Sequence, residues 1–502
     1  MAKVKTLDNA FFGHPKPLSS LFFTEMWERF SFYGIRPLLI LFMVASLQNN
    51  GLGIDTVTAS AIVGIFGGAI YIAALPGGWI ADNWLGQEGS VWYGSIIIAL
   101  GHLSIALSAW LAVHFFYLGL ILIVIGSGLF KTCISVIVGM LYKDGDHRRD
   151  SGFSIFYMGI NLGAFLAPIV GGFLSEEYGW HAGFAVGGIG MLIALVIFRM
   201  SAMPSMTKFA KAENVENSWG APKNVSKATK NWVFGSIATL IIVFIGVSFE
   251  LIPFSPVVIV DYTMVIIAVC VVGYFLGLFF FAKLNRKERF QLIICLILFT
   301  ASAFFWSAFE QQPTSMNLFV DSYTDRVIFG YEVPTAWFQS INSIFIIIFA
   351  PLFAILWPMM YRYNMEPSSI TKFAFGLFFA AIGFVCLYIA SKIVMSGDAL
   401  ASPMWMVACM LFLTFGELCL SPVGLSIMTK IAPKMIRGQI MGLWFASLSL
   451  GNLVASKVGG NVQADTIGDL PGIFQTVIIA LVVVGGILLI LNIPIRKIDK
   501  DI

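Results

Sequence analysis

Seven charged residues stand inside apolar runs that are long enough to cross a membrane. They are Glu25, Glu28, Arg29, Arg36, Lys131, Glu310 and Glu417. A charged side chain costs about 3 kcal/mol at the centre of a bilayer on insertion scales, so seven unpaired charges would cost on the order of 20 kcal/mol. We therefore expect these side chains to face one another or a wet cavity, where both signs together could bind a charged solute and carry a proton. The alternative is that they form buried pairs that only fix how the helices pack.

Four of these charges form a stripe on the first helix. Glu25, Glu28 and Arg29 follow the spacing i, i+3, i+4, and Arg36 lies two turns further along the same face. Arginine stays charged and can contact a carboxylate through two N–H groups. A glutamate beside it takes up or loses a proton according to whether the arginine is occupied. The stripe therefore predicts an anion site next to a proton site.

Lys131 ends a glycine-containing run, residues 126–131, on the fourth helix. Small residues in such a run allow helices to approach closely. A lysine near a helix end can snorkel to the interface, but Lys131 lies about ten residues from the cytosolic end of its helix, too deep for that to be the simplest explanation. We expect Lys131 to act as a second buried cation.

The composition is that of an integral membrane protein. Of 502 residues, 58% are hydrophobic and 11% are charged, and the mean hydropathy is +0.88. The charged fraction of soluble domains is about 25%. Apolar runs of spanning length lie near residues 18–47, 57–81, 91–112, 115–141, 152–174, 182–198, 232–249, 262–282, 291–311, 336–361, 373–391, 402–428, 438–456 and 473–494. The chain is therefore predicted to be all-α, with about fourteen transmembrane helices arranged as six, two and six.

This order divides the chain into four predicted segments: an N-terminal six-helix bundle at 1–202, a cytosolic linker at 203–231, an inserted two-helix hairpin at 232–290 and a C-terminal six-helix bundle at 291–502. Basic residues in short loops stay on the cytosolic side. Of the thirty Lys and Arg residues, we place outside only Arg326, Lys392 and Lys457. We expect a multi-pass protein of the cell inner membrane with both termini in the cytoplasm. The basic residues do not form one stripe, which argues against binding nucleic acid.

Four separated motifs resemble the proton-dependent oligopeptide transporters of the major facilitator superfamily. They are residues 25–34 (EMWERFSFYG), 156–164 (FYMGINLGA), 305–312 (FWSAFEQQ) and a set within 416–445. The likeness covers nearly the whole chain. It implies the major facilitator fold, with two six-helix bundles and the inserted helix pair of bacterial members. It also implies a proton-coupled symporter, not an enzyme, that imports dipeptides and tripeptides by alternating access without a cofactor, and we expect a monomer.

The resemblance also implies roles for individual residues. The peptide carboxylate would be held by Arg29 and Lys131. The peptide amino group would be held by Asn161, Asn342 and Glu417. Pockets for its side chains would be lined by Tyr33, Tyr71, Trp306 and Trp444. Proton coupling would involve Glu25, Glu28 and Glu310. Gating salt bridges between the halves would pair Arg36 with Glu310, near the outer end of its helix just before a loop at Gln311, and Lys131 with Glu417.

Several of these residues could instead have an ordinary structural role. The aromatic residues could be ordinary core or lipid-facing side chains, and Asn161 and Asn342 could make interhelical hydrogen bonds. Two stretches also depart from the family pattern. Phe32 stands where a tyrosine is usual, so one hydroxyl contact is missing. In the loop motif 78–88, Asn83 and Glu88 replace common basic residues, so Asp82 should cap a helix or pair with another neighbour.

Three other functions would make different demands on the sequence. A membrane-embedded enzyme would need a catalytic constellation, but the histidines are dispersed and no His-Glu-x-x-His motif occurs. A nucleotide-driven pump would need a phosphate-binding Gly-x4-Gly-Lys-Ser/Thr loop, which is absent from the sequence. A carrier of nitrate or another small anion could use Arg29 and Lys131 without Glu417. Glu417 and the two asparagines favour a zwitterionic substrate.

Overall fold

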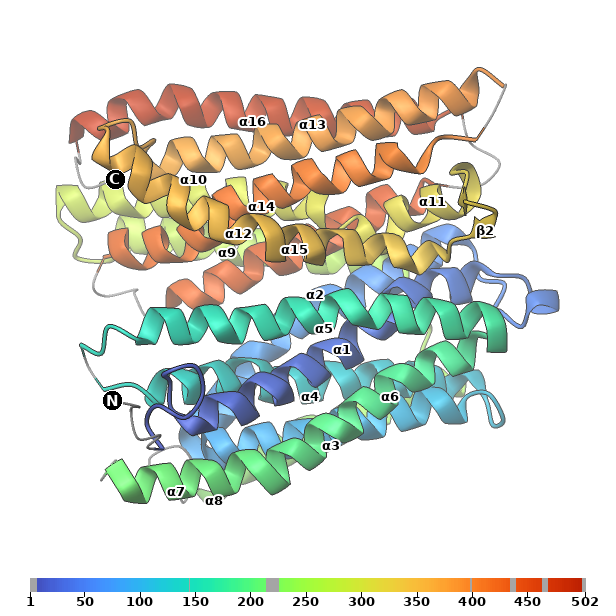
Figure 1. Cartoon of the computed structure of the whole chain (residues 1–502), viewed down its shortest axis with the longest axis horizontal. Helices are drawn as coiled ribbons and strands as arrows, with labels where there is room; N and C mark the ends of the chain where they lie inside the picture. Colours follow the sequence, from blue (N-terminus) through green and yellow to red (C-terminus); the bar gives the residue numbers. More distant parts are fainter. Residues whose placement is uncertain are drawn as a thin grey trace, which may run out of the picture. The chain divides into compact units, whose positions relative to one another are not determined.

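The computed structural model describes residues 7–143, 145–213, 225–397, 400–433, 439–462 and 468–498, and nearly all of its regular structure is helical (Figure 1). The helices in chain order are α1 Lys16–Val44, α2 Thr56–Ile80, α3 Gly86–Leu107, α4 Val113–Met140, α5 Arg149–Tyr178, α6 Trp180–Ile197, α7 Met203–Glu213, α8 Lys227–Ser248, α9 Pro256–Phe281, α10 Arg286–Phe309, α11 Asn317–Tyr323, α12 Ser340–Arg362, α13 Ser369–Met395, α14 Pro403–Ile431, α15 Ile440–Gly460 and α16 Leu470–Ile498. Two short strands, β1 Val327–Ile328 and β2 Tyr331–Glu332, pair as an antiparallel hairpin. Short 3-10 or π turns lie at Leu47–Asn49, Ala81–Leu85, Phe198–Ala202, Gln312–Met316 and Thr335–Gln339.

Within the described residues, the predicted number of about fourteen membrane-spanning helices is confirmed. Eleven stretches are long and apolar enough to cross a bilayer, and the first of them, Thr56–Leu107, contains both α2 and α3. Helices α1 and α15 add 29 and 21 residues of helix, so the described residues contain fourteen helices of spanning length. The lower apolarity of α1 comes from its buried charges.

Helix starts follow local sequence signals. Asn285 accepts a hydrogen bond from the Glu288 backbone N–H, and the Glu288 carboxylate accepts one from the Asn285 backbone N–H, which forms a capping box at the start of α10. Ser226 and Ser368 cap α8 and α13 in the same way, through one side-chain oxygen each. These caps satisfy backbone donors that the membrane could not.

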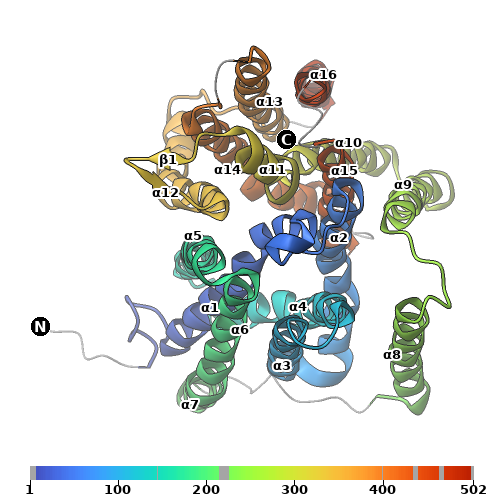
Figure 2. The same cartoon turned by 90° about the vertical axis from the view of Figure 1, so that its right-hand side faces the viewer.

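The chain forms two compact units. The first unit contains Met1–Leu38 and Ala69–Ser255, and Figure 2 shows its helices nearly end-on. Glycines set the helix spacing here: a Cβ added to Gly77 of α2 would lie 2.0 Å from the carbonyl oxygen of Gly128 in α4. A Cβ on Gly163 of α5 would lie 2.2 Å from the carbonyl oxygen of Met26 in α1. At these points the backbones of α2 and α4, and likewise of α1 and α5, lie too close together for any side chain at the glycine.

The second unit contains Leu39–Gly68 and Pro256–Ile502. Figure 2 shows α13 beside α14 and α16, and α10 packs on α15. The first half of α2 also belongs to this unit, because Gly64 and Gly67 lie against Ser456 and Asn452 of α15. Small residues again bring the helices together.

Two local predictions differ from the structure. The predicted linker 203–231 begins with a helix, because α6 continues through the turn Phe198–Ala202 into α7, while residues 214–224 lie outside the described part of the chain. The predicted loop at Gln311 is only a turn. Glu310 caps the end of α10, and Glu310 and Gln311 form a buried two-residue turn before Gln312–Met316, which leads into α11. The segment boundaries themselves remain predictions.

Candidate functional site

The charges of α1 form a closed cluster in the first unit. Arg29 Nε lies 3.2 Å from Glu25 Oε1 and 2.5 Å from Glu28 Oε2, so the three residues share one face as their spacing predicts. Each of the three is at least 95% buried. Two carboxylates and one guanidinium leave one excess negative charge, which a proton or a nearby cation can balance.

The two carboxylates are not equivalent. Glu28 makes the closer contact with Arg29. Glu25 contacts Arg29 through Oε1, whereas its Oε2 is buried and has no hydrogen-bond partner among the described residues. A buried oxygen without a partner is costly, and a proton on it would remove a buried charge without displacing a hydrogen bond. Glu25 is therefore the better placed of the two to take up a proton.

Phe32 lies beside both arginines of α1. Its ring centroid is 5.7 Å from the Arg29 guanidinium carbon and 6.0 Å from that of Arg36. Arg36 also lies 6.0 Å from the Tyr33 ring. A ring face attracts a cation, so Phe32 keeps a contact with both guanidinium groups although it lacks a hydroxyl.

Lys131 of α4 lies over the ring of Tyr71 from α2, with Nζ 4.1 Å from the ring centroid. Gly128 lies three residues before Lys131 and Gly77 six residues after Tyr71, and the close approach of these glycines holds the two helices together. Lys131 also interacts electrostatically with Glu25. Lys131 is half-buried, and its charge lies near enough to Glu25 to act on the charged cluster of α1.

Asn161 lies on α5 and is buried. Its side-chain Nδ2 donates to the carbonyl oxygen of Tyr157, 3.0 Å away in the same helix. This bond is therefore not interhelical. Gly163, two residues further along, lies against the backbone of α1 and so brings this part of α5 close to the first helix.

In the second unit, Glu417 of α14 has an amide partner. Asn342 Nδ2 of α12 lies 3.3 Å from Glu417 Oε2 and 3.0 Å from Thr414 Oγ1. Thr414 in turn donates to the carbonyl oxygen of Met410 at 2.7 Å. The interhelical hydrogen bond considered for Asn342 is thus present, and it orients a carboxylate that could accept a further donor. Thr414 was missed because a threonine in an apolar helix carries little signal.

Two predicted aromatic residues are buried in this unit. Trp306 packs against Phe305 and Phe309 on α10, and its Nε1 has no hydrogen-bond partner among the described residues. A Cβ on Gly424 of α14 would lie 2.3 Å from the Trp444 ring. The contacts of both rings fit core packing, while the open indole N–H of Trp306 also offers a donor.

Each unit gathers its own predicted residues. The first unit brings together Glu25, Glu28, Arg29, Tyr33, Arg36, Tyr71 and Lys131. In the second unit, Asn342 contacts Glu417, and Glu310 is close enough to Glu417 for a like-charge interaction. The pairs Arg36–Glu310 and Lys131–Glu417 join residues of different units and stay predictions.

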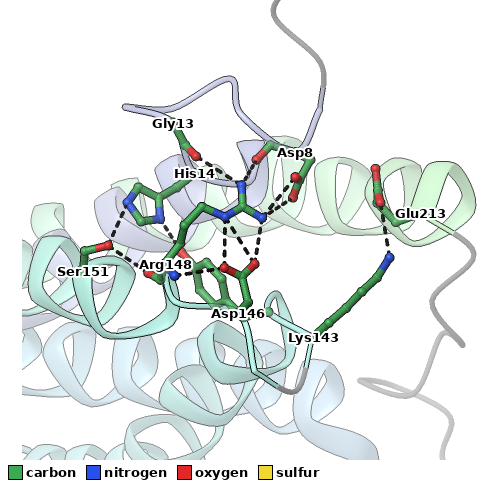
Figure 3. Close-up of polar contacts among 9 residues, drawn as sticks. Asp8, Gly13, His14, Lys143, Asp146, Arg148, Ser151 and Glu213 are labelled. Atoms are coloured by element: carbon green, nitrogen blue, oxygen red, sulfur yellow. Dashed lines mark hydrogen bonds and ion pairs between the residues drawn. The ribbon is translucent and has the colours of Figure 1, made fainter.

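A second polar cluster, which sequence reasoning missed, ties the start of the chain to the α4–α5 connection (Figure 3). Arg148 Nη2 lies 3.1 Å from an oxygen of Asp8 and 2.7 Å from one of Asp146. His14 shares hydrogen bonds with the Tyr142 hydroxyl, 2.9 Å from Nδ1, and with the Ser151 hydroxyl, 3.3 Å from Nε2. Asp8 and Arg148 are 140 residues apart in the sequence, so no pattern of neighbouring residues predicts that they meet.

Ionisation in this cluster follows from its contacts. Hydrogen bonds from Arg148 lower the pKa of Asp146 to about 2. Burial, with help from the charge of Arg148, lowers the pKa of His14, and burial raises the pKa of Tyr142 to about 12. At neutral pH the cluster therefore contains a neutral histidine beside a fully formed ion pair.

The loop motif after α2 has its own pairing. Asp82 accepts a hydrogen bond from Gln87 Nε2 at 2.7 Å, and Asn83 donates to the carbonyl oxygen of Trp79 at 2.9 Å. Gln87 thus supplies Asp82 with the other neighbour that the departure at Asn83 predicts. As for metals, within the described ranges no three His, Cys, Asp or Glu side chains lie close enough together to hold an ion.

Comparison with known proteins gives a consistent result. A family model described as the POT family matches residues 89–470. A peptide transporter of Yersinia enterocolitica subsp. palearctica, YePEPT, is 55% identical over 492 residues, which cover 98% of this chain and 96% of the relative. A di-/tripeptide transporter of Lactococcus lactis subsp. cremoris is 32% identical over 514 residues, with both chains fully covered. A crystal structure of a variant of peptide transporter POT in complex with alafosfalin is similar with a TM-score of 0.87, 37% identity and coverage of 98% of this chain and 97% of that one.

Proposed function

The chain belongs to the POT family, and from this premise we propose that it is a proton-coupled symporter that imports dipeptides and tripeptides by alternating access. The relatives named as peptide and di-/tripeptide transporters support the substrate class. The observation that carries the proposal is the buried Glu25–Glu28–Arg29 cluster, with the charge of Lys131 near enough to act on Glu25. The cluster provides cations that can bind a substrate carboxylate. In the same place it provides a glutamate that can exchange a proton.

The roles of the substrate-binding residues follow from their chemistry. Arg29 and Lys131 hold the peptide carboxylate, since both are buried or half-buried cations of one unit. Glu417 accepts from the peptide amino group, and the hydrogen bond from Asn342 orients it for that contact. Asn161 assists through its side-chain oxygen. Tyr33, Tyr71, Trp306 and Trp444 line the pockets for peptide side chains.

Proton entry drives the cycle. A proton on Glu25 weakens its pairing with Arg29, which frees the guanidinium for the substrate carboxylate. Protonation of Glu310 weakens its bridge to Arg36, and the balance between the two access states then shifts by the difference in pairing energy. Lys131 and Glu417 form the second bridge that opens and closes with the cycle.

The protein works as a monomer in the cell inner membrane, with both termini in the cytoplasm, and it catalyses no covalent reaction. The test is uptake of a labelled dipeptide into vesicles that contain the purified protein, with and without an inward proton gradient. Concentrative uptake only with the gradient is the expected result. Equal accumulation without a gradient would contradict proton coupling, and full competition by nitrate would favour a carrier of small anions.

A further inference from the structure

The hairpin between α11 and α12 carries an apolar tip. The strands pair Val327 with Glu332 and Ile328 with Tyr331, which leaves Phe329 and Gly330 as a two-residue turn. Phe329 is fully exposed, and Val327, Ile328 and Tyr331 are exposed as well. Four large apolar or aromatic side chains within five residues form a patch of the kind that marks contact with a lipid or protein surface.

The backbone of the tip is unusual for these side chains. Phe329 has φ +52° and Gly330 has φ +81°. A turn with positive φ at both central residues suits Asn or Asp followed by Gly, whereas a bulky residue in the left-handed region is strained. Phe329 is therefore a poor choice for the turn itself, and a favourable contact of its ring would offset the strain.

The base of the hairpin is fixed, in contrast to its tip. Arg326 Nη2 lies 2.8 Å from Glu332 Oε1, and Arg326 Nη1 donates to the carbonyl oxygen of Val333 at 2.9 Å. Ala401 donates to the carbonyl oxygen of Tyr323 and accepts from the backbone N–H of Asp325. The two charges of the strand ends neutralise each other at the base, so the tip can enter an apolar phase without taking a charge with it.

The chain keeps the hairpin close to the ends of two apolar stretches of spanning length. The apolar stretches on either side are Arg286–Tyr323 and Thr335–Arg362, so Phe329 is six residues from each. Six residues span at most about 20 Å when fully extended. Figure 1 shows the hairpin level with the end of α13, and Figure 2 shows it extending sideways past α12, away from α13 and α14 of the same unit.

An aromatic pair typical of the membrane interface links the hairpin to the turn before α12. The rings of Tyr331 and Trp337 have centroids 6.1 Å apart, and Trp337 lies in the turn that leads into α12. Tyr and Trp gather at the level of lipid headgroups because one part of the ring system is apolar and another is polar. The side chains closest to the tip therefore match the environment that its position gives it.

We propose that the hairpin Val327–Glu332 is a lipid-binding element whose tip, led by Phe329, inserts into the headgroup and upper acyl region of the outer leaflet beside α12. Its partner is the bilayer surface. Insertion holds the end of α11 and the start of α12 at a fixed depth, and α11 follows the turn that contains Glu310 through Gln312–Met316.

The test uses a fluorescent probe at the tip. Cys270 is the exposed cysteine among six, so Ile328→Cys in a Cys270→Ser protein directs an environment-sensitive label to position 328 and keeps the Phe329 ring. The full chain is reconstituted in vesicles of phosphatidylethanolamine and phosphatidylglycerol, with or without bromine-substituted acyl chains. The matched control is Asn50→Cys, at the exposed tip of the α1–α2 connection, where φ is also positive at +56°.

A blue-shifted emission that bromolipids quench at 328, with a water-like and unquenched signal at 50, is the expected result. A second protein separates the ring from the loop: the label at 328 should lose quenching when Phe329→Asn is added, because Asn fits the turn but not the lipid. Equal signals at 328 and 50, or quenching at 328 that Phe329→Asn leaves unchanged, would overturn the proposal. A blue shift at 328 that appears only at high protein-to-lipid ratio would also overturn it, because the tip would then contact a second copy of the chain.

Discussion

Replacing Glu25 by Gln should uncouple transport from protons without unfolding the protein. In the structure Arg29 Nε is 3.2 Å from Glu25 Oε1, which corresponds to an attraction of about 5 kcal/mol at an effective dielectric constant of about 20. Gln loses this attraction, but it also removes one of two buried carboxylates that share a single guanidinium. These effects oppose each other, so the variant keeps its fold while losing the site at which a proton adds.

The size of the functional effect follows from the driving force. A difference of one pH unit across the membrane is worth about 1.4 kcal/mol per proton, which supports about tenfold accumulation when one proton moves with one peptide. We expect the parent protein to approach this ratio in vesicles and Glu25→Gln to reach only equal concentrations inside and outside. Peptide counterflow needs no net proton movement, so it should persist in the variant.

Two related variants serve as controls. Glu28→Gln also makes the cluster neutral, but it removes the carboxylate in closer contact with Arg29 and keeps the open oxygen of Glu25, so accumulation should fall less. Arg29→Gln leaves both carboxylates buried and unpaired, and it should lower the free energy of unfolding by about 3–5 kcal/mol. Tenfold accumulation by Glu25→Gln would refute the assignment. Loss of counterflow together with accumulation would show that Glu25 acts in binding or folding instead.

Further predictions concern the other charged groups. Lys131→Ala should weaken dipeptide binding by about 2–5 kcal/mol, because the peptide carboxylate loses a cation; calorimetry should show this loss for the free acid and little change for the peptide amide, and equal losses would exclude the contact. Asn342→Leu removes the donor 3.3 Å from Glu417 and should weaken binding of a free dipeptide by about 1–3 kcal/mol, with a smaller effect on its N-acetylated form. Since Arg148 lowers the pKa of Asp146 to about 2, this pair stabilises the fold above about pH 4 and stops doing so as the pH falls through about 2. Arg148→Gln should remove the part of the protein's stability that depends on acid pH in this way. Thermal unfolding in detergent across this pH range would measure the change. If the parent and the variant lose stability identically as the pH falls, the pair contributes nothing to stability.

The sequence predicts those parts of the fold that depend on local patterns. Each of the fourteen apolar runs corresponds to a helix, because a spanning helix needs a long run and the runs are separated by polar breaks. Helices α7 and α11 were missed for the same reason, since they have 11 and 7 residues and contain polar side chains. The β1–β2 hairpin was also missed, because its strands have two residues each and cannot show an alternating pattern.

In the candidate site, too, contacts within one helix could be predicted and contacts between distant segments could not. Glu25, Glu28 and Arg29 could be placed together because helical geometry alone brings residues at i, i+3 and i+4 into contact. The pairing of Asn342 with Thr414 and Glu417 joins two helices, and nothing in either helix specifies which turn faces the other. The ion pair of Arg148 with Asp8 joins residues 140 positions apart, so no local pattern in the sequence predicts it.

Two glycines determine the position of Lys131, the second cation of the candidate site. Lys131 can lie 4.1 Å from the Tyr71 ring centroid only if α2 and α4 approach closely, and that approach depends on Gly77, whose Cβ would lie 2.0 Å from the Gly128 carbonyl oxygen. Alanine at either glycine would push the two backbones apart, since backbone atoms cannot move aside as a flexible side chain can. The ammonium group would then move relative to Arg29 although neither cation had changed. The position of the predicted carboxylate clamp is therefore set by two glycines as much as by its two charges.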